Sequence, residues 1–261
     1  MIKLIVSDID GTLVNNEKEV PVSFWKAFER MQELDILFCV ASGRQIQSLH
    51  ELFAPIKNNI AYAPDNGASL IYQNKTLFEK LITPADYLPI MRTCNEINGI
   101  GVALCGRDRA YIKTDSKWIF DEIARHYPAH TTVSDFAAID DDIFKITICD
   151  EGISRLNSYQ YLKKYQNDFN VVISGEIWLD ITGKDVNKGN AITHLQRILE
   201  ITPEETVVFG DHMNDVEMIQ CAKHSYAMKN AQEELKALAK YVTEYDNNEA
   251  GVVKEIEKIL K

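Results

Sequence analysis

The stretch SDIDGTL, residues 7–13, ends the first apolar run of the chain and carries two carboxylates two positions apart. Side chains at positions i and i+2 of a strand point to the same side, so Asp8 and Asp10 are expected to share a face. At about 4 Å and an effective dielectric near 20, two such charges repel by roughly 4 kcal/mol unless a cation lies between them or one is protonated. A divalent metal is the simplest occupant, although a bare Asp-x-Asp fits a solvated turn equally well.

Segments with strand and helix character alternate outward from this stretch, which predicts an α/β fold with a largely parallel sheet. Predicted strands cover residues 3–7, 36–41, 59–63, 206–209 and 225–228. Predicted helices lie near residues 24–34, 45–53, 189–199 and 216–222, and a closing helix ends at residue 260. Residues 65–80 carry the Asn-Gly and Asn-Lys turn signals of a β-hairpin. Gly11-Thr12 permits a tight turn at the carboxyl end of the first strand, where parallel sheets bind their ligands.

The middle of the chain has a different pattern, with longer helices mixed with several short strands, as in a separate α+β domain. The strands are expected at residues 102–104, 111–113, 144–149 and 178–182. We therefore predict a core formed by residues 1–82 and 185–261 and an inserted domain formed by residues 83–184. Linkers near residues 81–84 and 183–187 would act as a hinge.

The overall composition limits the possible partners and compartment. The chain of 261 residues has 28 basic and 39 acidic residues and a net charge of -11, a field that repels nucleic acid and anionic membranes. Its five cysteines are widely spaced and form no C-x-x-C pair, so neither a disulfide framework nor a zinc knuckle is indicated. No stretch has the length of a signal-peptide core or a membrane span. We expect a cytoplasmic protein, and nothing indicates an obligate protein partner.

Three further stretches carry groups that can bind anions or cations. Ser42-Gly43-Arg44 follows a predicted strand and leads into a helix, a suitable anion cradle. An acidic cluster follows another strand in GDHMND, residues 210–215, and exceeds what one helix cap requires. Lys188 stands at the start of a predicted helix, where the helix dipole disfavours a cation, so an anionic partner is expected.

Together these stretches resemble the signature of the haloacid dehalogenase superfamily of phosphohydrolases. In chain order they are Asp8-x-Asp10-Gly-Thr, Ser42-Gly-Arg44, Lys188-Gly and Gly210-Asp211-x-x-Asn214-Asp215. The long insert, followed by LDITGKDVNKGNAI at residues 179–192, resembles the Cof-type branch with a C2-type α+β cap. One departure lies in AMKNA, residues 227–231, where Lys229 occupies a position that is usually a small glycine.

The resemblance implies a Rossmann-like core in which Asp8 is a nucleophile that forms an aspartyl phosphate. Asp10 would protonate the leaving oxygen and then take a proton from water, and its proximity to Asp8 is expected to raise its pKa. Mg²⁺ would be held by Asp8, the backbone carbonyl of Asp10 and Asp211, because hard oxygen ligands suit that ion. Asp215 would support this metal shell.

The remaining motif residues are assigned to the phosphate. Lys188 would supply a second positive charge, and Ser42 with nearby backbone N–H groups, including that of Gly43, would hold the phosphate oxygens. Asn214 would position Lys188 or the phosphate. Arg44 could either contact the substrate or brace its own loop, and the sequence leaves both open.

Other candidate residues are better explained without catalysis. Pro128 between His126 and His130 should break the helix that would align them as metal ligands, so a surface loop is expected. Asp140–Asp142 are expected in a solvated turn, and His212 is expected to face solvent. Three residues with helical spacing are expected in the core of the inserted domain: Trp118, Phe120 and Ile123. Residues 105–111, CGRDRAY, are either a specificity loop or a solvated hairpin tip.

The combined interpretation is a Mg²⁺-dependent phosphatase of small phosphorylated metabolites, with sugar phosphates as the leading class by resemblance. The inserted domain would decide the substrate by closing over the site. A phosphomutase would use the same aspartyl phosphate, and a noncatalytic protein that binds phosphorylated metabolites is a further alternative. The intact set of Asp8, Asp10, Lys188 and Asp211 argues against the noncatalytic alternative.

Overall fold

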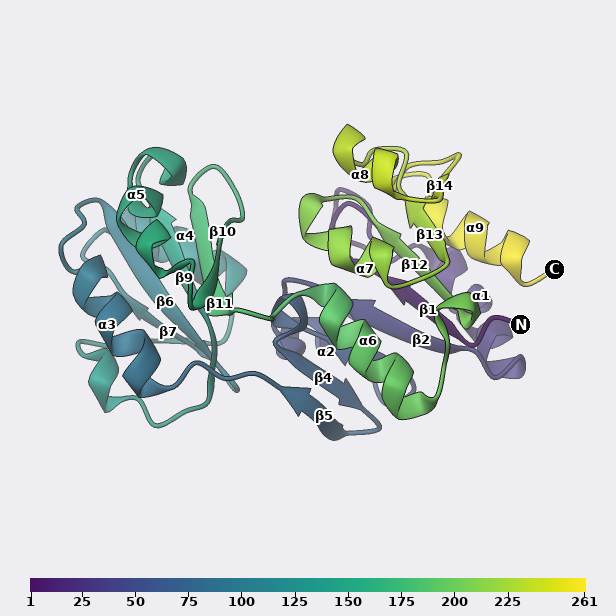
Figure 1. Cartoon of the computed structure of the whole chain (residues 1–261), viewed down its shortest axis with the longest axis horizontal. Coiled ribbons are helices and arrows are strands. Elements are labelled where there is room, and N and C mark those ends of the chain that lie inside the picture. Colours follow the sequence, from purple (N-terminus) through teal and green to yellow (C-terminus); the bar gives the residue numbers. More distant parts are fainter. The chain divides into compact units, whose positions relative to one another are not determined.

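The computed structural model describes residues 1–261 and divides into two compact units (Figure 1). Unit 1 combines Met1–Glu79 with Asn187–Lys261, and unit 2 is Lys80–Val186. Each unit has its own sheet and its own apolar clusters. No helix in either unit has the length and apolar character that crossing a membrane requires.

Unit 1 is built on an eight-stranded sheet. Its strands are β1 (Leu4–Ser7), β2 (Leu37–Ala41), β3 (Ala61–Ala63), β4 (Ser69–Tyr72), β5 (Lys75–Glu79), β12 (Thr206–Gly210), β13 (His224–Ala227) and β14 (Tyr241–Val242). The order across the sheet is β14-β13-β12-β1-β2-β3-β4-β5. All neighbours are parallel except for β3 with β4 and β4 with β5, which pair antiparallel.

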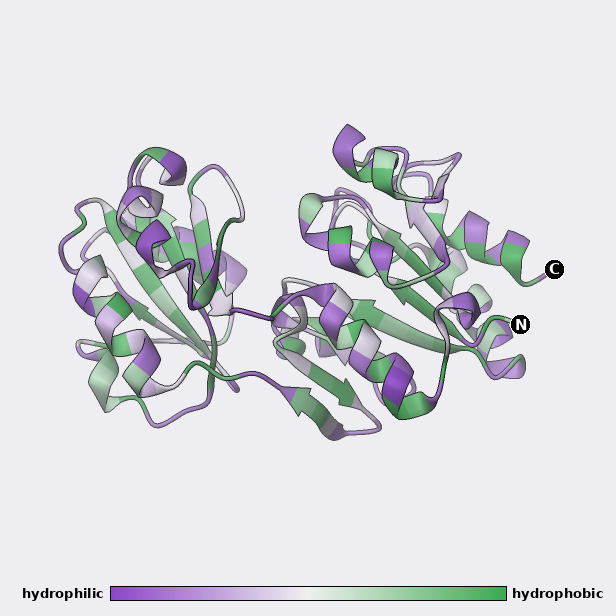
Figure 2. Ribbon diagram, in the orientation of Figure 1, coloured by the Kyte–Doolittle hydropathy of each residue, from purple (hydrophilic) through white to green (hydrophobic).

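Helices cover both faces of this sheet. They are α1 (Val22–Glu33), α2 (Ile46–Leu52), α6 (Lys188–Leu199), α7 (Val216–Gln220), α8 (Glu233–Leu238) and α9 (Gly251–Ile259). In Figure 1, α6 and α7 lie in front of the sheet and α1 and α2 behind it. The sheet is apolar on both faces for this reason, and its central strands are uniformly hydrophobic (Figure 2).

The strand register brings three loops to one edge of the sheet. Ser7, the last residue of β1, lies opposite Val40 on one side and Phe209 on the other. The residues that follow β1, β2 and β12 therefore emerge next to one another. This edge, at the carboxyl ends of the parallel strands, is where such sheets bind ligands.

An aromatic cluster fixes α1 against the sheet. Phe24 is fully buried, with its ring centroid 5.1 Å from that of Phe38 on β2 and 6.0 Å from that of Phe53. Pro21 lies immediately before the first residue of α1. After the helix, Asp35 adopts a left-handed conformation with φ of 55°, and the chain turns there toward β2. Burial of each such ring stabilises the folded state by roughly 2 kcal/mol. The loop after β1 therefore leads into a helix that is firmly packed on the sheet.

Unit 2 is an α+β unit with a six-stranded sheet. Its strands are β6 (Ile100–Gly106), β7 (Ala110–Lys113), β8 (His130–Thr132), β9 (Ile143–Asp150), β10 (Phe169–Ile173) and β11 (Trp178–Gly183), and its helices are α3 (Pro84–Cys94), α4 (Lys117–His126) and α5 (Ser158–Leu162). The order is β10-β11-β9-β6-β7-β8, antiparallel except for β7 with β8. Thr83 and Asp86 form a capping box at the start of α3.

The predicted α/β fold class is confirmed, with three local differences. Residues 233–238 and 241–242 form α8 and β14, which were not predicted, and the closing helix is Gly251–Ile259. The edge strands β8 and β10 were not predicted, because they are short and only partly buried. Trp118, predicted in the core, is 50% exposed, since Ile119 and Ile123 form the buried stripe of α4 instead.

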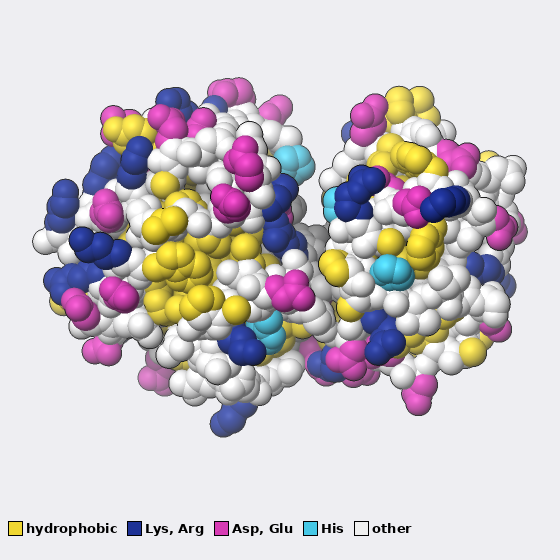
Figure 3. Space-filling model, turned by 180° about the vertical axis from the view of Figure 1, so that it is seen from behind, with side chains coloured by type: hydrophobic (Ala, Val, Ile, Leu, Met, Phe, Trp, Pro, Cys, Tyr) yellow, Lys and Arg dark blue, Asp and Glu magenta, His cyan; other side chains and the backbone are white.

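The surface carries charges of both signs. Acidic and basic side chains are interspersed over the face drawn in Figure 3, with no single-sign region covering either unit in that view. On this face, the net charge of -11 does not appear as one acidic patch.

Candidate active site

A buried lysine joins two buried carboxylates at the carboxyl edge of the unit 1 sheet. The Lys188 ammonium donates to Asp8 Oδ1 and to Asp215 Oδ1, each at 2.6 Å. Lys188 is 1% exposed, Asp8 5% and Asp215 0%. Asn187 sets this geometry, because its side chain caps α6 by accepting from the N–H of Asn190 at 2.7 Å, which makes Lys188 the first helical residue.

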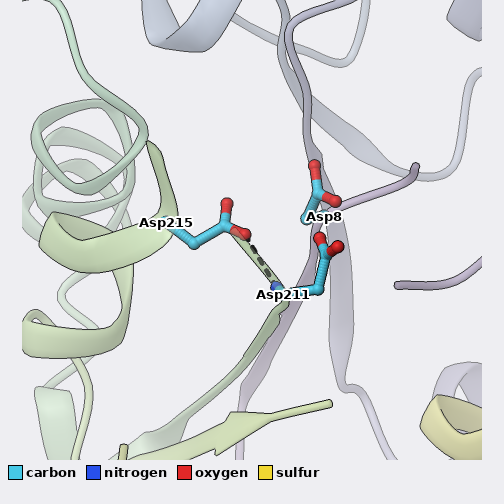
Figure 4. Close-up of side chains that lie close together, drawn as sticks. All are labelled: Asp8, Asp211 and Asp215. Atoms are coloured by element: carbon cyan, nitrogen blue, oxygen red, sulfur yellow. Dashed lines mark hydrogen bonds between the residues drawn. The ribbon is translucent and has the colours of Figure 1, made fainter. Parts of the chain in front are cut away.

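Both carboxylate oxygens of Asp215 accept hydrogen bonds from the protein. Its Oδ2 accepts the backbone N–H of Asp211 at 2.9 Å and that of His212 at 3.2 Å, and its Oδ1 accepts Lys188. The bond from Asp211 is drawn in Figure 4. Asp215 thus holds the lysine and the loop after β12, and its support of a metal shell stays a prediction.

Asp211 lies across from Asp8 and completes an acidic cluster. One carboxylate oxygen from each of Asp8, Asp211 and Asp215 lies within 4.8 Å of the others (Figure 4). Thr12 donates its hydroxyl to Asp211 Oδ1 at 3.1 Å. Gly11, with φ of 78°, passes so close to Asp211 that a Cβ at this position would collide with the carboxylate. Glycine is therefore required where the loop after β1 meets the loop after β12.

The free oxygens of this cluster fit a divalent cation. Asp8 Oδ1 accepts Lys188 and Asp211 Oδ1 accepts Thr12, whereas no protein donor meets Oδ2 of either carboxylate. Carboxylate oxygens without a protein donor, on the buried Asp8 and the partly buried Asp211, are the hard ligands that such cations prefer. Asp8 and Asp211 therefore offer the open oxygens of the three-carboxylate group that could hold a metal, and Asp215 is its third member.

The charge balance of the cluster supports the same conclusion. Burial raises the pKa of Asp8 to about 8; the Lys188 ammonium opposes this rise, and the two neighbouring carboxylates add to it. Burial, reinforced by the charge of Asp215, also raises the pKa of Asp211. For Lys188, burial alone would lower the pKa, but its two carboxylate partners raise it overall. One cation among three carboxylates leaves negative charge that a metal would neutralise.

Asp10 is paired with two cations, Arg44 and Lys18. Arg44 donates from Nε to Asp10 Oδ2 at 2.8 Å and from Nη2 to Oδ1 at 2.7 Å, and Lys18 donates to Oδ1 at 2.8 Å. Burial opposes them, yet Arg44 and then Lys18 lower the pKa of Asp10 to about 2. The expectation of a raised pKa is wrong. β1 ends at Ser7, so strand alternation does not extend to Asp10.

The phosphate-binding candidates lie at the ends of β2 and β12. Ser42 is 1% exposed and its Oγ accepts the N–H of Arg44 at 3.2 Å. Asn214 donates its amide to Asn66 Oδ1 at 3.1 Å, and no hydrogen bond joins it to Lys188. Asn66 adopts φ of 57° and its side chain lies beside Gly43. In this structure the lysine is positioned by Asp215, and Asn214 joins the loop after β12 to the turn after β3.

Sequence reasoning missed three residues of the site: Thr12, Lys18 and Asn66. Thr12 lies in the first motif, so its role as a donor to Asp211 could have been suspected. Lys18 and Asn66 act through contacts 8 and 148 positions away in sequence, with Asp10 and Asn214 respectively. No local pattern indicates such partners.

No hydrogen bond joins Asp8, Asp211 or Lys188 to the side chains of His126, His130, His212 or Lys229. His126 ends α4 and approaches Glu122 at 3.6 Å, and the Nδ1 atom of His130 lies 2.8 Å from the carbonyl oxygen of Tyr127. His212 is exposed. Lys229 is directed to the surface, where its ammonium lies 3.7 Å from Glu249.

The acidic turn at Asp140–Asp142 is more organised than a solvated turn. Asp142 pairs with Arg107 at 2.7 Å, and Asp141 accepts the hydroxyl of Tyr111 at 2.9 Å. The Arg107 guanidinium also lies 5.3 Å from the ring centroid of Phe144. The segment 105–111 is therefore braced by this turn.

In comparisons with known proteins, one protein family matches nearly the whole chain. A family described as haloacid dehalogenase-like hydrolase matches residues 5–256. The Escherichia coli protein named 5-amino-6-(5-phospho-D-ribitylamino)uracil phosphatase YbjI is 31% identical over 265 residues, which cover 100% of this chain and 97% of that protein.

Solved structures agree with this match. SMU.1108c from Streptococcus mutans has a TM-score of 0.90 and 30% identity, covering 100% of this chain and 99% of that chain. BT4131, described as a sugar phosphatase of HAD subclass IIB, has a TM-score of 0.83 and 25% identity and covers 98% of both chains. The likeness extends through both units.

Proposed function

The chain belongs to the haloacid dehalogenase-like hydrolases, and from that premise we propose that it is a Mg²⁺-dependent phosphatase of small phosphorylated metabolites that works through an aspartyl phosphate. The observation that carries the proposal is the buried contact of Lys188 with Asp8, beside the open oxygens of Asp8 and Asp211. A carboxylate can attack a phosphate dianion only where positive charge is concentrated. This site provides one buried ammonium and a place for a divalent cation.

In the first half-reaction, Asp8 attacks phosphorus in line with the leaving oxygen. A bond forms between Asp8 and phosphorus, the ester P–O bond breaks, and Asp10 gives its proton to the departing oxygen. Because Arg44 and Lys18 keep Asp10 ionised in the free protein, both must turn away from it, toward the substrate or solvent, before it can carry a proton.

In the second half-reaction, water attacks the phosphorus of the aspartyl phosphate. Asp10 takes a proton from the water, the bond between Asp8 and phosphorus breaks, and inorganic phosphate leaves. Lys188 stays beside Asp8 through both steps and balances its changing charge. When bound, Mg²⁺ held by Asp8, Asp211 and the backbone carbonyl of Asp10 would neutralise negative charge between carboxylate and phosphate.

We assign substrate selection to unit 2, the inserted cap, and sugar phosphates remain the leading substrate class. BT4131 is described as a sugar phosphatase, and YbjI is named for a substrate with a phosphorylated ribityl chain. None of the five cysteines forms a disulfide, which fits the cytoplasm as the compartment we propose.

The deciding experiment is a panel of hexose, pentose and ribityl phosphates with Mg²⁺, assayed for free phosphate and for isomers. Release of phosphate with the parent alcohol is expected. Isomer formation without phosphate release would make the protein a phosphomutase. Binding without either product would make it a noncatalytic binding protein.

Removal of divalent metal is expected to abolish turnover, and Mg²⁺ to restore it, because Asp8 and Asp211 would otherwise repel the phosphate. Binding itself should depend on pH. With a pKa near 8, Asp8 carries a proton in the metal-free protein at lower pH, and Mg²⁺ must displace it, so affinity rises from pH 6 to pH 8 and then levels off. Calorimetry in two buffers of different ionisation enthalpy measures the released proton. Full activity in verified metal-free protein would contradict the assignment.

Asp10→Asn should separate the two half-reactions. An aryl phosphate has a weakly basic leaving group that needs little protonation, so Asp8 should still be phosphorylated, whereas a sugar phosphate should react far more slowly. Hydrolysis of the aspartyl phosphate would lack its base. The variant should release a burst of aryl alcohol, about one per site, followed by a slow rate.

Intact mass should then detect phosphate trapped on Asp8, and the sugar phosphate should give almost no burst. Equal loss of phosphorylation rate with both substrates, without phosphoenzyme, would remove Asp10 from the role of acid and base.

A further inference from the structure

A cavity of about 520 Å³ opens in unit 2, and every residue that lines it belongs to that unit. It lies at the end of the sheet where Ile100 pairs with Asp150. The chain enters unit 2 at the opposite end, because the N–H of Ile82 donates to the carbonyl of Ile143 at 2.7 Å. The eight residues of β9 separate the two ends by roughly 24 Å, at about 3.4 Å per residue.

The floor of the cavity is apolar and reaches the packed interior. Ile97, Val102 and Phe136 are each at most 7% exposed and belong to the main apolar cluster of the unit. Ile119 of α4, which is fully buried, also lines the cavity. An apolar group placed here would be removed from water.

The rim of the cavity carries charges of both signs that have no ion-pair partner. Lys113, Asp115 and Glu151 line the rim, and no salt bridge joins them to one another or to other residues. The Lys113 ammonium lies 6.0 Å from the Phe136 ring centroid. Next to the cavity, Lys117 pairs with Asp121 at 2.8 Å. The cavity therefore presents open charges of both signs above a hydrophobic floor.

We propose that this cavity binds a free α-amino acid with an apolar side chain. Lys113 receives the carboxylate, Asp115 receives the ammonium group with Glu151 as a second acceptor, and the side chain lies on the apolar floor. Lys113 and Asp115 are two residues apart, so their Cα atoms are within about 7 Å, which suits the adjacent opposite charges of an α-amino acid. The cavity volume is within the usual range for small-molecule sites.

The test uses the full chain without phosphorylated substrate, titrated calorimetrically with L-leucine and L-phenylalanine. Binding is expected for at least one of them. N-acetyl-L-leucine lacks the ammonium charge and L-leucinamide lacks the carboxylate, and each should bind at least tenfold more weakly than L-leucine. Because no phosphate ester is present, the result does not depend on the proposed phosphatase activity.

Variants locate the binding in the cavity. Lys113→Met and Asp115→Asn should each weaken binding at least tenfold, and Lys113→Arg, which keeps the charge, should retain most of it. Lys117→Met is the matched control, since the Lys117 ammonium pairs with Asp121 outside the cavity, and it should bind as the unaltered chain does. Circular dichroism confirms that each variant is folded. The proposal is overturned if neither amino acid binds at millimolar concentration, if the blocked analogues bind equally well, or if Lys113→Met binds normally.

Discussion

Replacing Asp8 with asparagine is expected to lower kcat/KM by at least about 10⁴-fold while the chain stays folded. The amide has the same shape and can still accept a hydrogen bond from Lys188, but it cannot act as the attacking carboxylate. No phosphoenzyme should be detected by intact mass during turnover of an aryl phosphate. The same mass measurement must show that the introduced asparagine has not deamidated to aspartate, which would restore activity.

The metal-free stability of this variant provides a second measurement. Folding raises the pKa of Asp8 from 3.8 to about 8, so the folded state keeps a proton that the unfolded state loses. The Asp8 carboxyl therefore costs stability increasingly as pH rises from 4 to about 8, and asparagine removes this cost. The melting temperature of Asp8→Asn relative to the unaltered chain should rise from pH 5 to pH 9.

Asp35→Asn is the matched control for the same chemical change. Asp35 is exposed, and its φ of 55° suits asparagine as well as aspartate, so activity and melting temperature should change little. Activity of mass-verified Asp8→Asn close to that of the control would show that Asp8 is not the nucleophile.

Lys188→Met is expected to lower kcat/KM by about 10³-fold and to destabilise the metal-free fold by roughly 3 kcal/mol at neutral pH. Both effects have one cause, because the substitution leaves Asp8 and Asp215 buried without their shared cation. Steady-state kinetics at saturating Mg²⁺ and chemical denaturation measure the two effects separately.

A second substitution separates stability from catalysis. Asp215→Asn added to Lys188→Met removes the buried charge of Asp215 that the first substitution leaves without its cation, so it should recover part of the stability but none of the activity. Lys3→Met removes only the exposed pair with Glu205 and should leave kcat/KM unchanged. If Lys188→Met kept its full kcat/KM, the ion pair would be structural only.

The sequence predicted the elements that place the site. Asp8 and Ser42 each follow an apolar strand, and β1 and β2 were predicted within one residue of their observed starts. Parallel strands of one sheet must end at a common edge, so an acidic pair, a serine and a second acidic cluster after three strands could be expected to meet. Lys188 at the start of a helix already indicated an anionic partner.

The partners of these side chains required the tertiary structure. Lys188 meets Asp8 across 180 positions and Asp215 across 27, and Arg44 reaches Asp10 across 34. Which donor reaches which acceptor depends on how loops from different strands pack. The pKa of Asp10 is lowered rather than raised for this reason.

The sequence by itself therefore determined the α/β fold class, the main strands and helices of the core, and the polar groups that follow them, because hydrophobic periodicity and turn residues act locally. The tertiary structure decided that Asp215 holds Lys188, that Asp10 is paired with Arg44 and Lys18, and that Trp118 faces solvent. Burial, charge pairing and pKa depend on atoms brought close in space from distant parts of the chain, and no local pattern specifies them.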